Sequence, residues 1–324
     1  MKAGTIVLLL TVAGLAVAAW VIGEVGVAPV LAAMRTIGGG GFAVFCLWSL
    51  LVLTVLGGAW AAVAPGSGVG FGEFVWARTV REGATDVLPF SQIGGLVVGG
   101  RALSARGVAE PLVYASMIAD LTTEMASQLV FTLAGVGLLV LALDGRTDPA
   151  GLRALACGGL GVTAAVMAAF AFGQRRVLGL AGSLGARLLP SIAGSLAAVQ
   201  AALDTCYRDR GRVLLSFALN LAAWVLSGAG AWIALRFMGV EITLLSVLAI
   251  ESLIFAVRSI AFVVPGAVGI QEGAYALVGP LFGLDPQTAV ALSLLKRARD
   301  LAIGIPAMLA WQLLESRRLI GRSR

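Results

Sequence analysis

Helix-breaking residues and a carboxylate occur together in an apolar stretch between residues 263 and 273. Proline cannot donate a backbone hydrogen bond, and glycine adopts backbone angles closed to other residues, so this stretch interrupts a helix. Unpaired backbone groups are costly in lipid, which means that the break is buried in protein or lines a wet cavity. The residues of the pattern are Pro265, Gly266, Gly269, Gln271 and Glu272.

Glu272 follows the break closely and is the strongest single candidate for a functional side chain. A carboxylate at membrane depth is costly, and such residues mark substrate or proton pathways. We expect it to have a basic partner. The nearest basic residues in the sequence are Arg258, Lys296, Arg297 and Arg299. The alternative is a structural kink that places Glu272 at the membrane interface.

Further charged residues lie within apolar spans at spacings that place them on one helix face. They either form buried ion pairs that fix helix packing or line a polar cavity for a lipid head group, and the two interpretations are compatible. The residues that share a helix face are Asp120 with Glu124, Lys296 with Asp300, and Glu251 with Arg258. Arg297 and Arg299 are next to Lys296 and Asp300 in the sequence.

Arginines flank an earlier broken segment, at about residues 89–100. A guanidinium donates two parallel hydrogen bonds and suits phosphate, so these arginines could form a basic cytoplasmic entrance for a lipid head group. The alternative is simple anchoring, which arginine at helix ends performs routinely. The set comprises Arg78, Arg81 and Arg101 with the nearby Glu82, Asp86, Ser91 and Gln92.

The composition of the 324-residue chain is that of a membrane protein, with 59% hydrophobic and 12% charged residues. Soluble proteins carry about 25% charged residues. The absence of histidine excludes histidine-based metal sites and Ser-His-Asp arrangements. Cys46, Cys157 and Cys206 are far apart and form no CxxC pattern. We therefore expect a single membrane domain over residues 1–324, with no metal and no cofactor.

Apolar runs long enough to cross a bilayer recur, so we expect an all-α, polytopic transmembrane helical bundle with about six to eight crossings. Two broken stretches, at about 89–100 and 264–284, could be re-entrant. The first run is too long for a signal-peptide core, and we interpret it as an uncleaved helix. The runs lie near residues 4–22, 42–64, 112–143, 154–173, 213–236, 242–263 and 288–314.

The net charge of +6 is spread between these spans, which argues against nucleic-acid binding and favours anionic lipid head groups as partners. The basic segment 174–212 and the basic C-terminal tail should be cytoplasmic, and the loops 23–41 and 144–153 external. Both termini then lie in the cytoplasm. We expect residues 184–206 to form a helix on the cytoplasmic membrane surface.

An offset of 176 residues relates two halves of the chain, 42–143 and 213–314, joined by the cytoplasmic segment 174–212. Paired interrupted segments in two halves point to a transporter binding site, and we expect the two breaks to lie close together at mid-depth. Shared hydropathy is the alternative explanation. The offset aligns Trp48 with Trp224, Pro89 with Pro265, Gly107 with Gly283 and Glu124 with Asp300.

The pattern Pro-Gly-x-x-Gly-x-x-Glu at residues 265–272 resembles the signature of the lysylphosphatidylglycerol synthase/flippase membrane-domain family. The first half of that family is similar to Leu88-Pro89-Phe90, Gly94-Gly95, Gly100-Arg101, Gly107-Val108 and the helix with Asp120 and Glu124. The resemblance covers nearly the whole chain and is greatest to short members associated with hopanoid biosynthesis. It implies a helical membrane fold with re-entrant segments and a role in lipid translocation. Large members add a soluble aminoacyl-transferase domain, and because the chain ends soon after its last helix we expect no lysine transfer here.

The leading hypothesis is a flippase-like lipid transporter of the bacterial inner membrane that handles a hopanoid or an anionic phospholipid. The nucleotide-binding pattern GxxxxGK[ST] is absent, so transport would be passive or coupled to a gradient, with Glu272, Asp120 and Glu124 as proton carriers. The alternatives are a membrane-embedded lipid-modifying enzyme and a non-catalytic scaffold of a lipid biosynthetic complex. The sequence is also compatible with a homo-oligomer.

Overall fold

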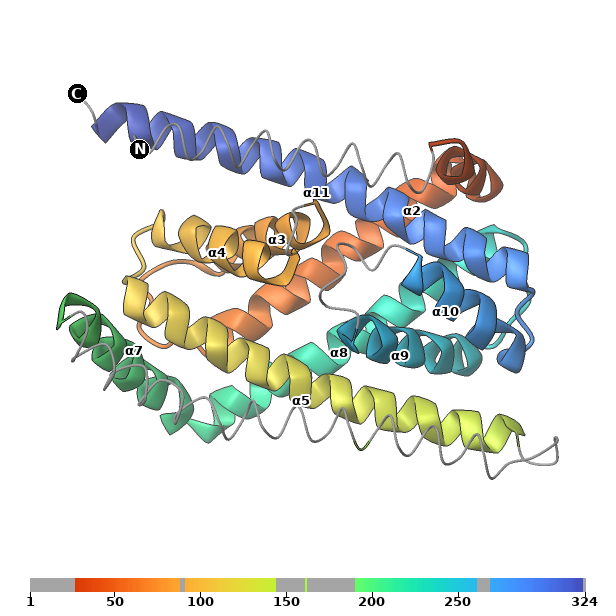
Figure 1. Ribbon diagram of the computed structural model, residues 1–324, viewed down its shortest axis with the longest axis horizontal. Helices are drawn as coiled ribbons and strands as arrows, with labels where there is room; N and C mark the ends of the chain where they lie inside the picture. The colour runs from red at the N-terminus through yellow and green to blue at the C-terminus, as the bar shows by residue number, and fades with distance from the viewer. Residues whose placement is uncertain (1–26, 88–90, 144–160, 162–189, 261–268, 323–324) are drawn as a thin grey trace.

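The computed structural model describes residues 27–87, 91–143, 161, 190–260 and 269–322, and its regular elements are helices (Figure 1). The all-α prediction is therefore confirmed for this part of the chain. The run predicted at 4–22 lies outside the described residues, and so does the run at 154–173 apart from residue 161. Pro89, Pro265 and Gly266 also lie outside them.

Long helices form the frame of the described fold. They are α2 (Val27–Ala62), α5 (Glu110–Leu143), α8 (Arg210–Phe237) and α11 (Pro286–Arg322). Among the described residues, three stretches are long and apolar enough to cross a membrane: Leu31–Ala62, Glu110–Leu141 and Arg210–Phe237. Large apolar side chains on these helices remain exposed, among them Leu47 (65%), Leu141 (72%) and Leu214 (67%). Exposed leucines of this kind fit helices surrounded by lipid, and they support a helical membrane bundle.

The first of these helices starts earlier than hydropathy predicts. Residues 27–41 belong to α2, whereas the sequence analysis assigns them to an external loop. Gly38 breaks the helical geometry with φ 71° and ψ 161°, so the helix is kinked at this residue. Gly41 is needed for packing, because a Cβ there would lie 3.0 Å from the Phe237 ring of α8. Gly38 thus separates two helical segments of α2, and Gly41 allows the second segment to pack against α8.

Short helices occur in pairs between the long ones. The first pair is α3 (Phe71–Val87) with α4 (Ser91–Ser104). The second is α9 (Leu244–Ile260) with α10 (Ile270–Val278), which continues as the 3₁₀ helix η2 (Gly279–Phe282). In Figure 1 both pairs lie between α11 above and α5 below, the first on the left and the second on the right. The predicted broken stretches overlap α4 and α10 with η2, and their insertion into the membrane as re-entrant segments stays a prediction. The helix α3 was not predicted, and α9 occupies the run that was predicted as a crossing at 242–263.

A further helix, α7 (Pro190–Arg208), lies beside α5 and leads into α8 (Figure 1). It overlaps the helix that the sequence predicts at 184–206. Asp209 lies between the two helices and is the N-cap of α8. Its side chain accepts hydrogen bonds from the amides of Gly211 (2.9 Å) and Arg212 (3.2 Å). The position of α7 on a cytoplasmic membrane surface stays a prediction.

Corresponding helices of the two halves begin about 176 residues apart in the sequence. The long helices α5 and α11 begin at 110 and 286, and the short helices α3 and α9 begin at 71 and 244. Gly107 precedes α5 and Gly283 precedes α11, and both have a positive φ, 99° and 84°. Figure 1 shows that the matching helices run in opposite directions: α2 runs from right to left and α8 from left to right, while α5 and α11 are likewise opposed.

Residues related by the 176-residue offset also lie at equivalent helix crossings in the two halves. Where α3 crosses α11, a Cβ on Gly83 would lie 2.9 Å from the Cα of Gly304. Where α9 crosses α5, the amide of Gln128 donates a hydrogen bond of 2.5 Å to Ser259. Residues 83 and 259 are 176 positions apart, and so are residues 128 and 304. This arrangement is that of an inverted structural repeat, and we retain internal duplication as our proposal.

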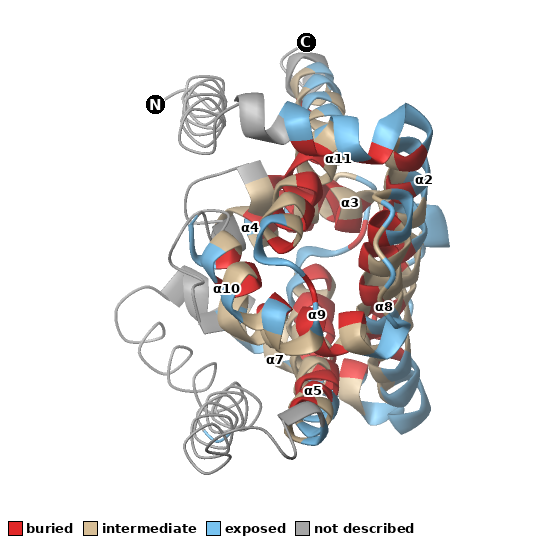
Figure 2. Cartoon of the chain, turned by 90° about the vertical axis from the view of Figure 1, so that its right-hand side faces the viewer, coloured by how far each residue is buried: buried red, intermediate tan, exposed pale blue. Residues whose placement is uncertain are grey.

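Each pair of short helices has its own hydrophobic core. One core contains Trp60, Phe74, Leu103 and Met117, from α2, α3, α4 and α5. The other contains Phe45, Leu235, Ile254 and Leu292, from α2, α8, α9 and α11. Buried residues of α2 and α8 face inward and exposed ones face outward in Figure 2. The charged residues predicted within apolar spans lie where these two cores adjoin the central parts of α5 and α11.

Candidate functional site

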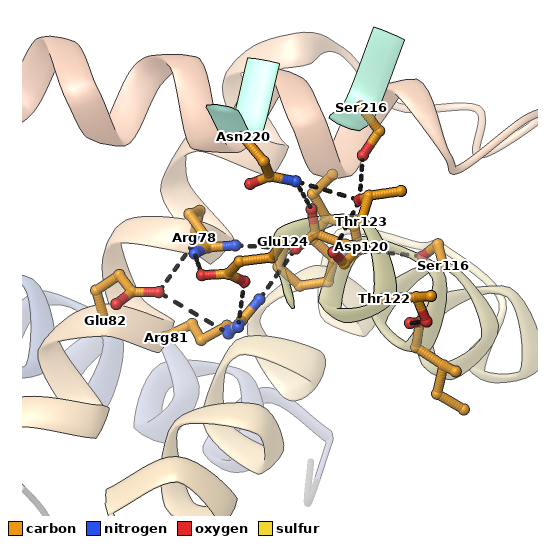
Figure 3. Close-up of polar contacts among 12 residues, drawn as sticks. Arg78, Arg81, Glu82, Ser116, Asp120, Thr122, Thr123, Glu124, Ser216 and Asn220 are labelled. Atoms are coloured by element: carbon orange, nitrogen blue, oxygen red, sulfur yellow. Dashed lines mark hydrogen bonds and ion pairs between the residues drawn. The ribbon is translucent and has the colours of Figure 1, made fainter. Parts of the chain in front are cut away.

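A buried network of ion pairs joins α3 to α5. Arg78 lies 2.9 Å from Asp120 and 2.7 Å from Glu124. Arg81 lies 3.1 Å from each of the same two carboxylates. Figure 3 shows both guanidinium groups directed at the carboxylates of α5, with Glu82 on their other side. Only 1% of the Arg78 side chain and none of the Asp120 side chain is exposed.

Helical spacing explains why this network forms. Arg78 and Arg81 are three residues apart and Asp120 and Glu124 are four apart, so each pair occupies one helix face. Buried charges are costly unless they are paired and hydrogen-bonded, and here each arginine contacts both carboxylates. Asp120 and Glu124 therefore form buried ion pairs with α3, and their role in fixing helix packing stays a prediction.

Polar side chains of α8 extend the network. Asn220, the only asparagine in the chain, donates hydrogen bonds to Asp120 (3.4 Å) and Thr123 (3.2 Å). The Thr123 hydroxyl also bonds to Ser216 at 2.8 Å (Figure 3). Asn220 was not predicted, although a single amide side chain inside an apolar span is a signal that could have identified it.

The arginines proposed as an exposed entrance are placed differently. Arg78 and Arg81 are buried, because the carboxylates on α5 neutralise them inside the bundle. Arg101 is 46% exposed and lies 3.2 Å from Glu315 of α11. The exposed part of the predicted entrance is therefore limited to Arg101 among these three. Ser91 and Gln92 begin α4, and their side chains lie outside the described residues.

A second buried cluster joins α9, α10 and α11. The Glu251 carboxylate accepts hydrogen bonds from the Tyr275 hydroxyl and from the Lys296 ammonium group. The ammonium group also donates to the Tyr275 oxygen at 2.8 Å and lies 5.0 Å from the centre of the Phe255 ring. All three polar side chains are at most 3% exposed. Tyr275 was not predicted, since one tyrosine in an apolar helix carries no distinct signal.

Glu272 has the basic partner that the sequence predicts. Its carboxylate accepts hydrogen bonds from Arg297 of α11 at 2.6 and 3.2 Å. It also accepts a bond of 2.8 Å from the amide of Gly269, which has φ 79° at the start of α10. Gln271 is buried beside it and donates to Ser293 at 2.8 Å. Glu272 thus both caps a short helix and pairs with a neighbouring one.

A third group of charges lies where α3, α9 and α11 approach one another. Arg299 donates hydrogen bonds of 2.9 and 2.5 Å to Asp300, and its guanidinium lies 5.1 Å from the Phe45 ring. Arg258, near the end of α9, lies 4.0 Å from Asp86 at the end of α3. The ends of α3 and α9, which precede the two predicted broken stretches, therefore lie close together, and the proximity of the stretches themselves stays a prediction.

These charges suit a polar site for ions or head groups better than a metal centre. Among the described residues, no three histidine, cysteine or acidic side chains are arranged to hold a metal ion. Arginine keeps its charge under all physiological conditions, so the α3–α5 network is a fixed electrostatic frame. The cluster of Glu251, Tyr275 and Lys296 contains groups that can exchange protons.

Comparison with known proteins identifies the family. No curated protein and no solved structure matches the chain. The family model described as the lysylphosphatidylglycerol synthase transmembrane region matches residues 6–307, which include every ion pair described above except the partner of Arg101, Glu315. The match detects the membrane region of these proteins and no catalytic domain. With this match over nearly its whole length, the chain belongs to the lysylphosphatidylglycerol synthase transmembrane-region family.

Proposed function

We propose that this protein moves a lipid between the two leaflets of a membrane. The observation that carries the proposal is the set of largely buried ion pairs on the short helices and on α5 and α11, in a chain that belongs to a transmembrane-region family. Ionisable residues within a membrane are expensive, and they mark pathways for polar substrates. A lipid head group is the polar part that must pass this region during translocation.

The inverted arrangement of the helices supports the same function. Transporters built from two oppositely oriented halves expose a central site alternately to each side by moving one half against the other. Here the ends of α3 and α9 meet in the centre, and α5 and α11 flank them. The charged side chains of both halves would then contact the head group in turn.

The identity of the lipid is part of the proposal. The sequence resemblance favours a hopanoid or an anionic phospholipid, and an inner-membrane location with both termini in the cytoplasm. Proton coupling through Glu272, Asp120 or Glu124 is retained as an expectation, although all three carboxylates are ion-paired in this conformation.

The test is a leaflet-exchange assay with the purified protein in liposomes. Fluorescent phospholipids in the outer leaflet are quenched chemically, and movement from the inner leaflet makes the quenching complete. We expect faster movement than in empty liposomes, and slower movement when Arg297 is replaced by Gln, with Arg106→Gln as a control at an exposed ion pair. No movement of any tested lipid, including an added hopanoid, would refute the proposal, and a chemically altered lipid would favour the enzyme.

A further inference from the structure

Asp86 and Arg258 form an ion pair whose bonding capacity is largely unused. Their nearest atoms are 4.0 Å apart, compared with 2.7 Å for Arg78 and Glu124. Among the described residues, neither Asp86 nor Arg258 takes part in a hydrogen bond. A guanidinium has five N–H donors and a carboxylate accepts about four hydrogen bonds, so both groups can still bind a ligand.

This pair is less buried than the charges of the second cluster. Asp86 is 23% exposed and Arg258 is 26% exposed, whereas Glu251 and Lys296 are 0% and 3% exposed. The two residues come from different halves of the inverted arrangement, at the described ends of α3 and α9. The pair is therefore a partly exposed contact between the two halves.

The surroundings of the pair carry both charges, and they are balanced once Arg78, the partner of Glu82, is counted. Asp86 interacts electrostatically with Glu82 on its own helix and with Arg299 and Asp300 on α11, in addition to Arg258. These five partly exposed residues comprise three carboxylates and two guanidinium groups. Asp300 is already engaged by Arg299, and Glu82 lies 2.9 Å from Arg78. Asp86 and Arg258 thus remain as the uncommitted anion and cation.

We propose that Asp86 and Arg258 bind the head group of a zwitterionic amino-phospholipid, of the ethanolamine type. The phosphate is bound by the guanidinium of Arg258, because its planar group donates paired hydrogen bonds to phosphate oxygens. The ammonium group is bound by the carboxylate of Asp86. An anionic head group without an amine would bind Arg258 and leave the Asp86 carboxylate without a cation. This assignment rests on the proposed function and specifies its substrate class.

The test measures lipid retention by native mass spectrometry of the purified protein. Equal amounts of phosphatidylethanolamine and phosphatidylglycerol are offered in detergent, and we expect preferential retention of phosphatidylethanolamine. The variant Asp86→Asn should lose this preference, and Arg258→Gln should lower the retention of both lipids. Loss of one charge-assisted contact corresponds to about a ten- to hundredfold weaker binding.

The controls separate binding from folding. Glu73 and Arg106 form an exposed ion pair of 3.0 Å away from the centre, and Glu73→Gln and Arg106→Gln should leave the preference unchanged. The conservative variants Asp86→Glu and Arg258→Lys keep the charges, so they should retain most of the preference if either neutral variant folds poorly.

Other outcomes overturn the inference. Equal retention of both lipids by the unaltered protein, or an unchanged preference in Asp86→Asn, would exclude a role of this pair in head-group selection. Retention of soluble phosphoethanolamine without retention of the phospholipid would exclude a lipid ligand. In the leaflet-exchange assay, movement of both lipids at equal rates would refute this inference but not the proposed function, whereas absence of any movement would refute the proposed function.

Discussion

Arg78 contacts three carboxylates while almost none of its side chain is exposed. Two of them, Asp120 and Glu124, are on α5, and the third is one turn along α3. A buried ion pair is weak evidence for net stability, but removal of one partner leaves an uncompensated buried charge. The role of Arg78 is therefore best seen in what its loss does to its partners.

Replacement of Arg78 by Gln should destabilise the protein by about 3–5 kcal/mol, because Asp120 and Glu124 lose their best cation while they stay buried. Thermal melting in detergent measures this effect. Arg106→Gln is the matched control, since its exposed ion pair with Glu73 should contribute about 0–1 kcal/mol. A similar melting temperature for both variants would show that the α3–α5 network does not hold the fold.

Glu272 combines two structural roles that substitutions can separate. Glu272→Gln keeps a carbonyl that can cap the Gly269 amide but loses the charge that pairs with Arg297. We expect a loss of about 1–3 kcal/mol for Gln and about 3–5 kcal/mol for Ala, measured by thermal melting. If Gln stops gradient-driven lipid movement without a matching loss of stability, Glu272 acts in transport. Unchanged stability and movement in both variants would remove it from the site.

At the scale of elements, the crossing of α3 and α11 depends on two glycines. A Cβ on Gly83 would lie 2.9 Å from the Cα and 3.0 Å from the carbonyl oxygen of Gly304. Gly83→Val should force the helices apart and cost about 1–3 kcal/mol. Gly137→Ala on α5 is the control, because nothing lies within 4 Å of its added Cβ and alanine favours a helix. Melting temperatures that fall equally in both variants would contradict this account of the crossing.

The two glycines with positive φ before α5 and α11 should respond alike. Gly107→Ala and Gly283→Ala each place a Cβ on a left-handed backbone, which costs about 1–2 kcal/mol. Thermal melting of both single variants and of the double variant checks this, and the two costs should add because the sites are separate. A large loss at one position only would show that the two connections are not equivalent.

Much of the element order was predictable, because apolar runs and helix breakers are local signals. The long helices and both broken stretches follow from hydropathy, proline and glycine alone. The start of α2 was not predicted, because a run of glycines is typical of a loop. The packing of Gly41 against Phe237 of α8 is a tertiary contact that the sequence does not reveal. The count of crossings depends on residues outside the described ranges and on α9 and α11, which cover the predicted runs 242–263 and 288–314 but are not among the candidate spans of the described residues.

The candidate site was predictable in its residue types but less so in its pairings. Helical spacing places Asp120 beside Glu124, yet it cannot say that arginines from α3 face them. Pairing depends on how helices cross, which is a tertiary property. For the same reason Arg78 and Arg81 were assigned to an exposed entrance, and Tyr275 and Ser293 were missed.

For the whole molecule, the opposed halves suggest how a central site could serve both leaflets. Contacts between halves include α2–α8, α5–α8, α3–α11 and α5–α9, and the last two occur at matching positions. Among the described ion pairs, Asp86–Arg258 and Arg101–Glu315 join helices of different halves. A movement of one half against the other would therefore change these contacts, together with the hydrogen bonds that Asn220 and Ser216 of α8 make to α5.

A cross-link between the halves should stop lipid movement if that motion is required. In a background without the native cysteines, Gln128→Cys and Ser259→Cys would join α5 to α9 through a short, reducible thiol reagent. We expect leaflet exchange to stop after cross-linking and to return after reduction. The control joins Glu73→Cys to Arg106→Cys, an exposed pair within the first half, and should leave exchange unchanged because the motion between halves stays free. Undiminished exchange in the fully cross-linked α5–α9 variant would mean that lipid crosses while the two halves stay fixed, for example along a continuous polar surface. That result would exclude the alternating mechanism.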